Sequence, residues 1–139
     1  MTSHRKDPIF IVVFGVMLAG AAFSYYWLGI DIAVRLRWWS IATEFDANAF
    51  TAQLSVWNDV AFYTVILAAP PSLYWAWNGD SRALASYAVV ILAGVVDWIL
   101  LINNAHWNGG VEGYLLFSGQ LFAYVYLVVF ALRDNPELR

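Results

Sequence analysis

Residues 84–102 read LASYAVVILAGVVDWILLI, and Asp97 is the one charged side chain in this run of nineteen residues. A helix of about 20 predominantly apolar residues is needed to cross the hydrocarbon core of a bilayer. The run therefore predicts a membrane-spanning helix over residues 82–103. A carboxylate at that depth is costly because it loses its hydration, so we expect Asp97 to be hydrogen-bonded, protonated or used in function.

Three other stretches are long and apolar enough to be membrane helices, namely residues 8–30, 47–77 and 113–132. Hydrophobic residues make up 62% of the chain and charged residues 12%, whereas soluble proteins carry about 25% charged residues. The sequence therefore predicts an all-α integral membrane protein. We expect one domain, residues 1–139, with four transmembrane helices in an up-down bundle and a short interfacial segment between the first two helices.

The second apolar stretch is too long for one membrane helix, and it contains Asp59 and the pair Pro70-Pro71. Each proline lacks an amide donor, so the pair predicts that this helix kinks or ends. Residues 72–77 would then lie at the membrane interface. The limits of the membrane portion of this stretch stay open.

The first helix begins like a secretory signal, with Arg5 and Lys6, an apolar run and small residues at 19–21. Because the apolar run continues to residue 30, we expect an uncleaved helix. With four spans, five of the seven basic residues fall on one side of the membrane: Arg5, Lys6, Arg82, Arg133 and Arg139. Arg35 and Arg37 fall on the other side, so the positive-inside rule predicts both termini in the cytoplasm, at a bacterial inner membrane.

Several kinds of chemistry are excluded or disfavoured by the residues present. The chain has no cysteine, which excludes disulfides, thiolate catalysis and iron–sulfur clusters. Lys6 is the only lysine and precedes the first helix, so covalent retinal is excluded. His4 and His106 fall at or beyond the predicted membrane boundaries, which disfavours a self-contained haem protein. The net charge of −3 gives no reason to expect nucleic acid as a partner.

A metal site is not predicted either. Asp59, Asp97, His106 and Glu112 are carboxylate and imidazole side chains of the kind that bind transition metals. No metal-binding spacing joins them in the sequence.

The polar residues gather toward the predicted outer side of the membrane. Asp97 and Gln120 each lie about 10 Å below that boundary, given a rise of about 1.5 Å per residue. They are level on consecutive antiparallel helices, so we expect a hydrogen bond between them, directly or through one water molecule. Asp59 and Tyr63 lie one turn apart on one helix face.

These four residues support two readings of Asp97. In the structural reading its carboxyl is neutral or hydrogen-bonded and ties two helices together, or contacts another subunit. In the functional reading Asp97 is an acid or base, and Asp59, Tyr63 and Gln120 orient a substrate.

Other residues are typical of packing surfaces. Gly15, Ala19 and Ala22 allow a second helix to approach closely. Residues 31–59 read as the interfacial segment, with Asp46 as a helix N-cap. An aromatic belt of tryptophans is expected at the membrane surfaces, with Trp98 lying deeper. The candidate contacts to a partner or lipophile are Gly15, Ala19, Ala22, Arg35, Arg37, Trp38, Trp39 and Trp98.

Two functions follow as hypotheses. The first is an accessory, structural or assembly subunit of a larger energy-converting or oxidising membrane complex, without catalytic activity or a cofactor of its own. It would pack against lipid and against larger cofactor-bearing membrane subunits, whose quinone, carotenoid or chlorin it would touch. The alternative is a small membrane enzyme or lipophile-binding protein with an outer-side polar pocket around Asp97.

Overall fold

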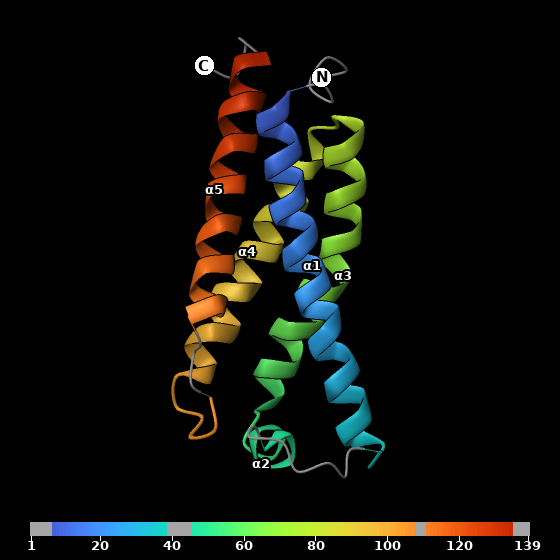
Figure 1. The fold of residues 1–139 in the computed structure, drawn as a ribbon, viewed down its shortest axis with the longest axis vertical. Coiled ribbons are helices and arrows are strands. Elements are labelled where there is room, and N and C mark those ends of the chain that lie inside the picture. The colour runs from blue at the N-terminus through green and yellow to red at the C-terminus, as the bar shows by residue number, and fades with distance from the viewer. Residues whose placement is uncertain (1–6, 39–45, 108–110, 135–139) are drawn as a thin grey trace.

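The computed structural model describes residues 7–38, 46–107 and 111–134, and every regular element in these ranges is a helix. In chain order the helices are α1 (Pro8–Arg35), α2 (Ala47–Ala52), α3 (Val56–Asn78), α4 (Arg82–Leu101) and α5 (Val111–Asp134). The four long helices lie side by side and alternate in direction, and α2 lies across one end (Figure 1). Three of them, α1, α4 and α5, contain stretches long and apolar enough to cross a membrane, as the sequence predicts.

Helix α1 begins where the sequence predicts and ends later. Asp7 is its N-cap and accepts a hydrogen bond from the Ile9 amide at 2.9 Å, with Pro8 in the first helical position. The helix continues to Arg35 rather than ending at residue 30. Asp31 and Arg35, one turn apart, form an ion pair at 2.9 Å that stabilises this polar last turn.

The C-terminus of α1 closes with a Schellman motif. The Trp38 amide donates to the Ala33 carbonyl at 2.8 Å, and the Arg37 amide donates to the Val34 carbonyl at 3.0 Å. Arg37 takes the left-handed conformation that this motif requires, with φ of 58°. An arginine therefore occupies a position where glycine is usual, and the side chains of Arg37 and Trp38 are both exposed.

The second apolar stretch forms two helices instead of one. Asp46 is an N-cap as expected, since its side chain accepts from the Ala49 amide at 3.0 Å, but it caps the short helix α2. A new helix then begins at Val56. Its N-cap, Ser55, forms a capping box with Asn58. This second cap explains why the chain does not continue as one helix from residue 47.

Of the two outcomes predicted for Pro70 and Pro71, a kink or an end, the helix does not end there, because α3 continues through both prolines to Asn78. Pro70 has no amide to offer the Ile66 carbonyl, and the hydroxyl of Tyr25 on α1 donates to that carbonyl instead, at 3.0 Å. Neighbouring helices often satisfy carbonyls freed in this way in membrane proteins.

Two serine hydroxyls bind the same loosened turn. Ser72 donates to the Ala68 carbonyl at 2.6 Å, and Ser86 of α4 donates to it at 3.2 Å. The two hydroxyl oxygens are themselves 2.6 Å apart. The proline turn of α3 is therefore held by polar groups from both α1 and α4.

Helices α3 and α4 form the most extensive helix pair. Ala69, Ser72 and Ala76 of α3 are each no more than 4% exposed, and such small side chains let the two backbones approach closely. Gly79 ends α3 in the left-handed conformation, with φ of 69°. In the following turn, hydrogen bonds from the side chain and amide of Arg82 hold the pKa of the Asp80 carboxyl below its usual value.

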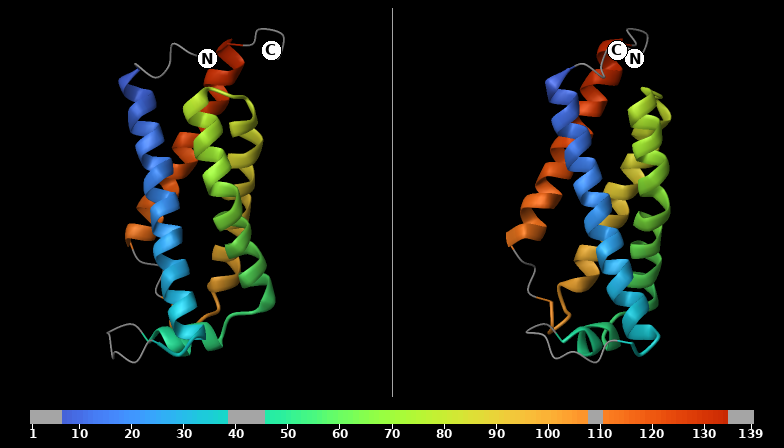
Figure 2. Two further views of the ribbon diagram at one scale, coloured as in Figure 1. Left: turned by 90° about the vertical axis from the view of Figure 1, so that its right-hand side faces the viewer. Right: turned by 45° about the vertical axis from the view of Figure 1, so that its right-hand side comes forward.

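The core lies between the four long helices (Figure 2). Its buried members come from every one of them: Val13, Met17, Ala21, Ala69, Ala76, Ala83, Tyr87, Val90, Ile91, Ala123 and Leu127. Many large apolar side chains point outward instead, such as Leu67, which is 76% exposed. So much exposed apolar surface is typical of helices whose solvent is lipid.

We expect Tyr25→Phe to lower the free energy of unfolding by about 1 kcal/mol, because the Ile66 carbonyl would lose the hydroxyl that replaces the missing Pro70 amide. Reversible unfolding in mixed micelles would measure this change. Tyr26→Phe is the matched control, since Tyr26 is 63% exposed. Equal effects of the two substitutions would contradict this role for the Tyr25 hydroxyl.

Candidate functional site

The largest polar group in the described structure, which we call the Arg35 cluster, comprises Asp31, Arg35, Asp59 and Tyr63. The Nε of Arg35 donates to both carboxylate oxygens of Asp31 at 2.9 Å, and its Nη2 donates to Asp59 at 2.7 Å. The hydroxyl of Tyr63 donates to Asp31 at 2.8 Å. One cation thus bridges two carboxylates and joins the end of α1 to the start of α3.

Helical spacing builds each half of the Arg35 cluster. Asp31 and Arg35 are four residues apart on α1, and Asp59 and Tyr63 are four residues apart on α3, so each pair lies on one face. The sequence analysis found the α3 pair but missed Asp31, which is only 8% exposed. Asp31 and Arg35 stand four residues apart at the end of an apolar helix, and this spacing could have predicted their ion pair.

Asp97 does not pair as expected. Its carboxylate accepts from the Nδ2 of Asn58 on α3 at 3.4 Å, and Asn58 is 4% exposed. No direct hydrogen bond to Gln120 is formed within the described residues. The amide of Gln120 instead lies against α1, where a Cβ added to Gly20 would fall 1.9 Å from its nitrogen.

The two residues are not level, as the sequence predicts them to be. Gln120 lines the same cavity as Val90 of α4, and Asp97 lies seven residues further along α4, about 10 Å along the helix axis. Helix α5 packs more extensively against α1 than against α4, so Gln120 points toward α1. The four residues of the functional reading are therefore divided: Asp59 and Tyr63 join the Arg35 cluster, Asp97 binds Asn58, and Gln120 lies elsewhere.

Trp98 is the centre of an aromatic cluster between α4 and α5. Its ring centroid lies 5.5 Å from that of Trp107, 4.8 Å from Tyr114 and 5.4 Å from Phe117. Gly113 leaves room for this ring, since a Cβ there would approach it to 3.3 Å. Trp98 thus packs within the chain, and its predicted contact with a lipophile remains a prediction.

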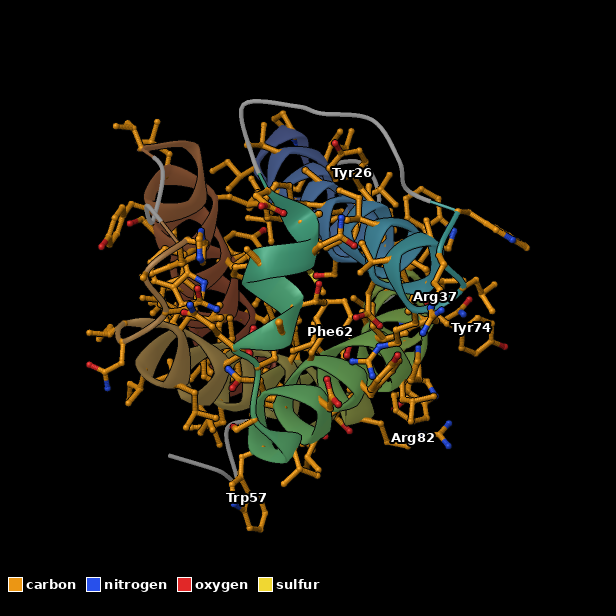
Figure 3. All side chains as sticks on the ribbon, turned by 90° about the horizontal axis from the view of Figure 1, so that it is seen from below. Tyr26, Arg37, Trp57, Phe62, Tyr74 and Arg82 are labelled. Atoms are coloured by element: carbon orange, nitrogen blue, oxygen red, sulfur yellow. The ribbon has the colours of Figure 1, made fainter. Side chains whose placement is uncertain are left out.

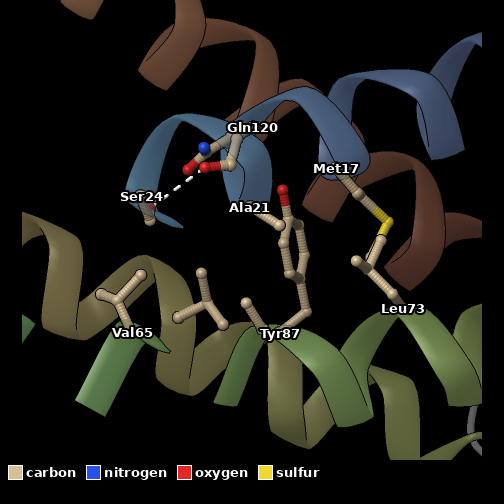
Figure 4. Close-up of a pocket in the computed structure, with 10 residues that line it drawn as sticks. Met17, Ala21, Ser24, Val65, Leu73, Tyr87 and Gln120 are labelled. Carbon is tan, nitrogen blue, oxygen red and sulfur yellow. Dashed lines mark hydrogen bonds between the residues drawn. The ribbon is translucent and has the colours of Figure 1, made fainter. Parts of the chain in front are cut away.

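A small cavity lies between the long helices (Figure 4). It has a volume of about 10 Å³, and its polar lining comes from Ser24, Tyr87 and Gln120. Tyr87 is 3% exposed, and its hydroxyl has no hydrogen-bond partner in the described part of the chain. The sequence analysis missed Tyr87, although a hydroxyl in the most apolar run of the chain was a signal.

The three small residues predicted as contacts on α1 lie on its outer face. Gly15, Ala19 and Ala22 are exposed, and a Cβ added to Gly15 would meet nothing within 4 Å. At the α2 end, Tyr26, Arg37 and Trp57 project outward (Figure 3). Trp38 is 75% exposed, whereas Arg35 is engaged by two carboxylates. Trp39 lies outside the described residues.

No three Asp, Glu or His residues stand close enough to hold a metal ion in the described ranges. The amide of His106 donates to the Asn104 side chain at 3.0 Å in the connection between α4 and α5. The side chain of Glu112, the fourth residue considered as a ligand, lies outside the description.

Comparison with known proteins adds no assignment. No protein-family model, curated protein or solved structure matches this chain. The function must therefore be argued from the geometry alone.

We expect Asp31→Asn to lower the free energy of unfolding by about 1–2 kcal/mol, because Arg35 would lose a charged hydrogen-bond partner. Unfolding in mixed micelles would measure this. Asp80→Asn is the control: it removes a carboxylate whose ion-pair partner Arg82 is 67% exposed, and it should change little. A neutral result for Asp31→Asn would show that the Arg35 cluster does not stabilise the α1–α3 contact.

We expect Asp97→Asn to fold and purify like the parent protein. An asparagine oxygen accepts the same hydrogen bond from Asn58, and the two side chains have the same shape. Helical content and size-exclusion behaviour in detergent would check this. Loss of an associated activity at unchanged protein yield would contradict the structural reading and support an acid or base role for Asp97.

Proposed function

We propose that this protein is an accessory subunit that packs against larger, cofactor-bearing proteins of an energy-converting or oxidising membrane complex. In this proposal α1, α3, α4 and α5 all span the membrane as an up-down bundle. Helix α3 has 23 residues, about 34 Å at a rise of about 1.5 Å per residue, enough to cross a bilayer. It also runs beside α4, which is apolar enough to span.

The observation that carries the proposal is the outer face of α1. The inner face of this helix supplies the buried core residues Val13 and Met17, so its packing within the chain is complete. Gly15, Ala19 and Ala22 lie on the opposite side and are exposed. Small residues one turn apart let another helix approach closely where no hydrophobic effect drives association.

Larger side chains border this strip of small residues. Ile11 is 57% exposed, Leu18 is 52% exposed and Tyr26 is 63% exposed. Ile11 and Tyr26 lie one turn beyond the two ends of the strip, and Leu18 lies beside it. Close packing between helices is the main source of helix association in lipid.

The end of α1 extends the same surface toward the membrane boundary. Trp38 is 75% exposed beside the exposed Arg37, and this pair of residue types is enriched at protein interfaces and at lipid headgroups. The orientation that suits the positive-inside rule puts this end outside the cytoplasm. It puts the start of α1 and the end of α5 in the cytoplasm of a bacterial cell.

The alternative, a small enzyme or lipophile-binding protein, has less support. Its four residues would have to converge on one pocket around Asp97. Asp59 and Tyr63 are engaged by Arg35 and Asp31, and Gln120 lies against Gly20 of α1. In the preferred proposal the protein carries no cofactor, and any quinone, carotenoid or chlorin in contact with it belongs to its partners.

We expect the double substitution Gly15→Leu and Ala19→Leu to reduce co-purification of partner subunits from native membranes by at least about tenfold, since bulky side chains would hold a partner helix away. The protein itself should keep its stability, because the space around Gly15 is open. Purification in mild detergent followed by quantitative mass spectrometry would measure this.

The control is Val125→Leu with Val129→Leu, which enlarges two side chains of α5 that are 57% and 59% exposed. This variant should retain its partners. Unchanged co-purification of the α1 variant, or a fully functional isolated monomer, would overturn the accessory-subunit proposal.

A further inference from the structure

The cavity at Tyr87 lies at a junction of α1, α3, α4 and α5. Ser24 and Gly20 belong to α1, Tyr87 to α4 and Gln120 to α5. Figure 4 shows the Tyr87 ring rising from α4 with its hydroxyl directed toward the side where Gln120 lies. Polar groups from three helices therefore approach one small space inside an apolar core.

The Tyr87 hydroxyl needs a hydrogen-bond partner in this cavity. It is buried and has no hydrogen-bond partner among the described residues. A buried hydroxyl left without a partner is strongly destabilising, and buried tyrosine hydroxyls are usually satisfied by a protein group or an ordered water molecule. The Ser24 hydroxyl donates to the Gly20 carbonyl, and neither Ser24 nor Gln120 forms a direct hydrogen bond with the Tyr87 hydroxyl in the described part of the chain.

The cavity has the size and chemistry for one occupant. Its volume of about 10 Å³ is that needed for the centre of a single water molecule. A larger lipophile does not fit. An ion is disfavoured, because none of the residues that line the cavity is charged.

We propose that this cavity binds one structural water molecule, which links the hydroxyl of Tyr87 to the amide of Gln120. The water accepts from the Tyr87 hydroxyl and donates to the carbonyl oxygen of the Gln120 amide. Its second hydrogen is directed to the hydroxyl oxygen of Ser24, which lines the cavity and donates its own hydrogen to the Gly20 carbonyl at 3.0 Å. The water then joins α1, α4 and α5, with the three hydrogen bonds typical of buried water.

Gly20 is part of this site through its lack of a side chain. A Cβ at this position would fall 1.9 Å from the Gln120 nitrogen and 2.8 Å from its amide carbon. Glycine therefore allows the Gln120 amide to lie beside the α1 backbone at the edge of the cavity. The inference is independent of the proposed function, because it concerns the interior of the chain and not its outer surface.

The sign of one substitution tests the proposal. If the water satisfies the hydroxyl, Tyr87→Phe removes a hydrogen-bonded network and should weaken the folding equilibrium constant by about three- to tenfold. If the hydroxyl is unpartnered, the same substitution removes a buried polar group and should strengthen folding. Reversible unfolding of the full chain in mixed micelles gives this constant, and unchanged or stronger folding would overturn the proposal.

A double-mutant cycle adds a second readout. Tyr87→Phe and Gln120→Leu should act together, with a combined effect that departs at least about twofold from the product of the two single effects. The control cycle pairs Tyr114→Phe with Gln120→Leu, since Tyr114 is 57% exposed and does not line the cavity. If the effect of the Tyr87→Phe, Gln120→Leu double variant equals the product of the two single effects, the proposed water-mediated contact would be overturned.

An experimental structure of the parent protein at about 2 Å resolution would test for the water directly, even if a variant fails to fold. In the parent protein we expect a density peak within about 3 Å of the Tyr87 hydroxyl. A well-ordered cavity without such a peak, or with density for a larger molecule, would overturn the assignment of water.

Discussion

The hydroxyl of Tyr25 donates to the carbonyl of Ile66 because Pro70, one turn further along α3, has no amide to offer it. The hydrocarbon core of a bilayer holds no water that could donate a hydrogen bond to this carbonyl, so the donor must come from the protein. The bond fixes α1 against the loosened turn of α3. The hydroxyls of Ser72 and Ser86 fix the same turn against α4. The prolines thus determine where two neighbouring helices lie, and α3 remains continuous through them.

The same requirement accounts for the remaining polar residues. Arg35 is balanced by Asp31 and Asp59, and Asp97 is bound by Asn58. The Arg35–Asp59 contact joins α1 to α3, and the Asn58–Asp97 contact joins α3 to α4, which suits a structural role. With its inner face and polar end occupied in this way, α1 retains its outer strip of small residues as a free surface for a partner. The accessory-subunit proposal follows from this difference between the two faces of α1: one packs within the chain, and the other is exposed.

The interior is asymmetric along its length. Charged groups are concentrated where α1, α3 and α2 meet, and the middle contains the apolar core with one small cavity. Tyr87 brings the one described hydroxyl of this region that the protein itself does not satisfy. A single water molecule there would complete the rule that governs Tyr25, Ser72 and Asp97, namely that each polar group inside the helices has a partner on another helix or between helices.

The sequence by itself determined the helical class, the apolar segments, the cap at Asp46, and the shared face of Asp59 and Tyr63. These features depend on composition and on local spacing, both of which are readable along one chain. Counting residues from the predicted membrane boundary placed Asp97 and Gln120 at one depth, whereas in the structure Gln120 lies beside Val90 of α4. Only the tertiary structure decided their neighbours, because the axial offset and the rotation of each helix depend on packing against the others. It also decided that α3 passes through its prolines, since the hydroxyl that makes this tolerable lies 41 residues away in the sequence, on α1.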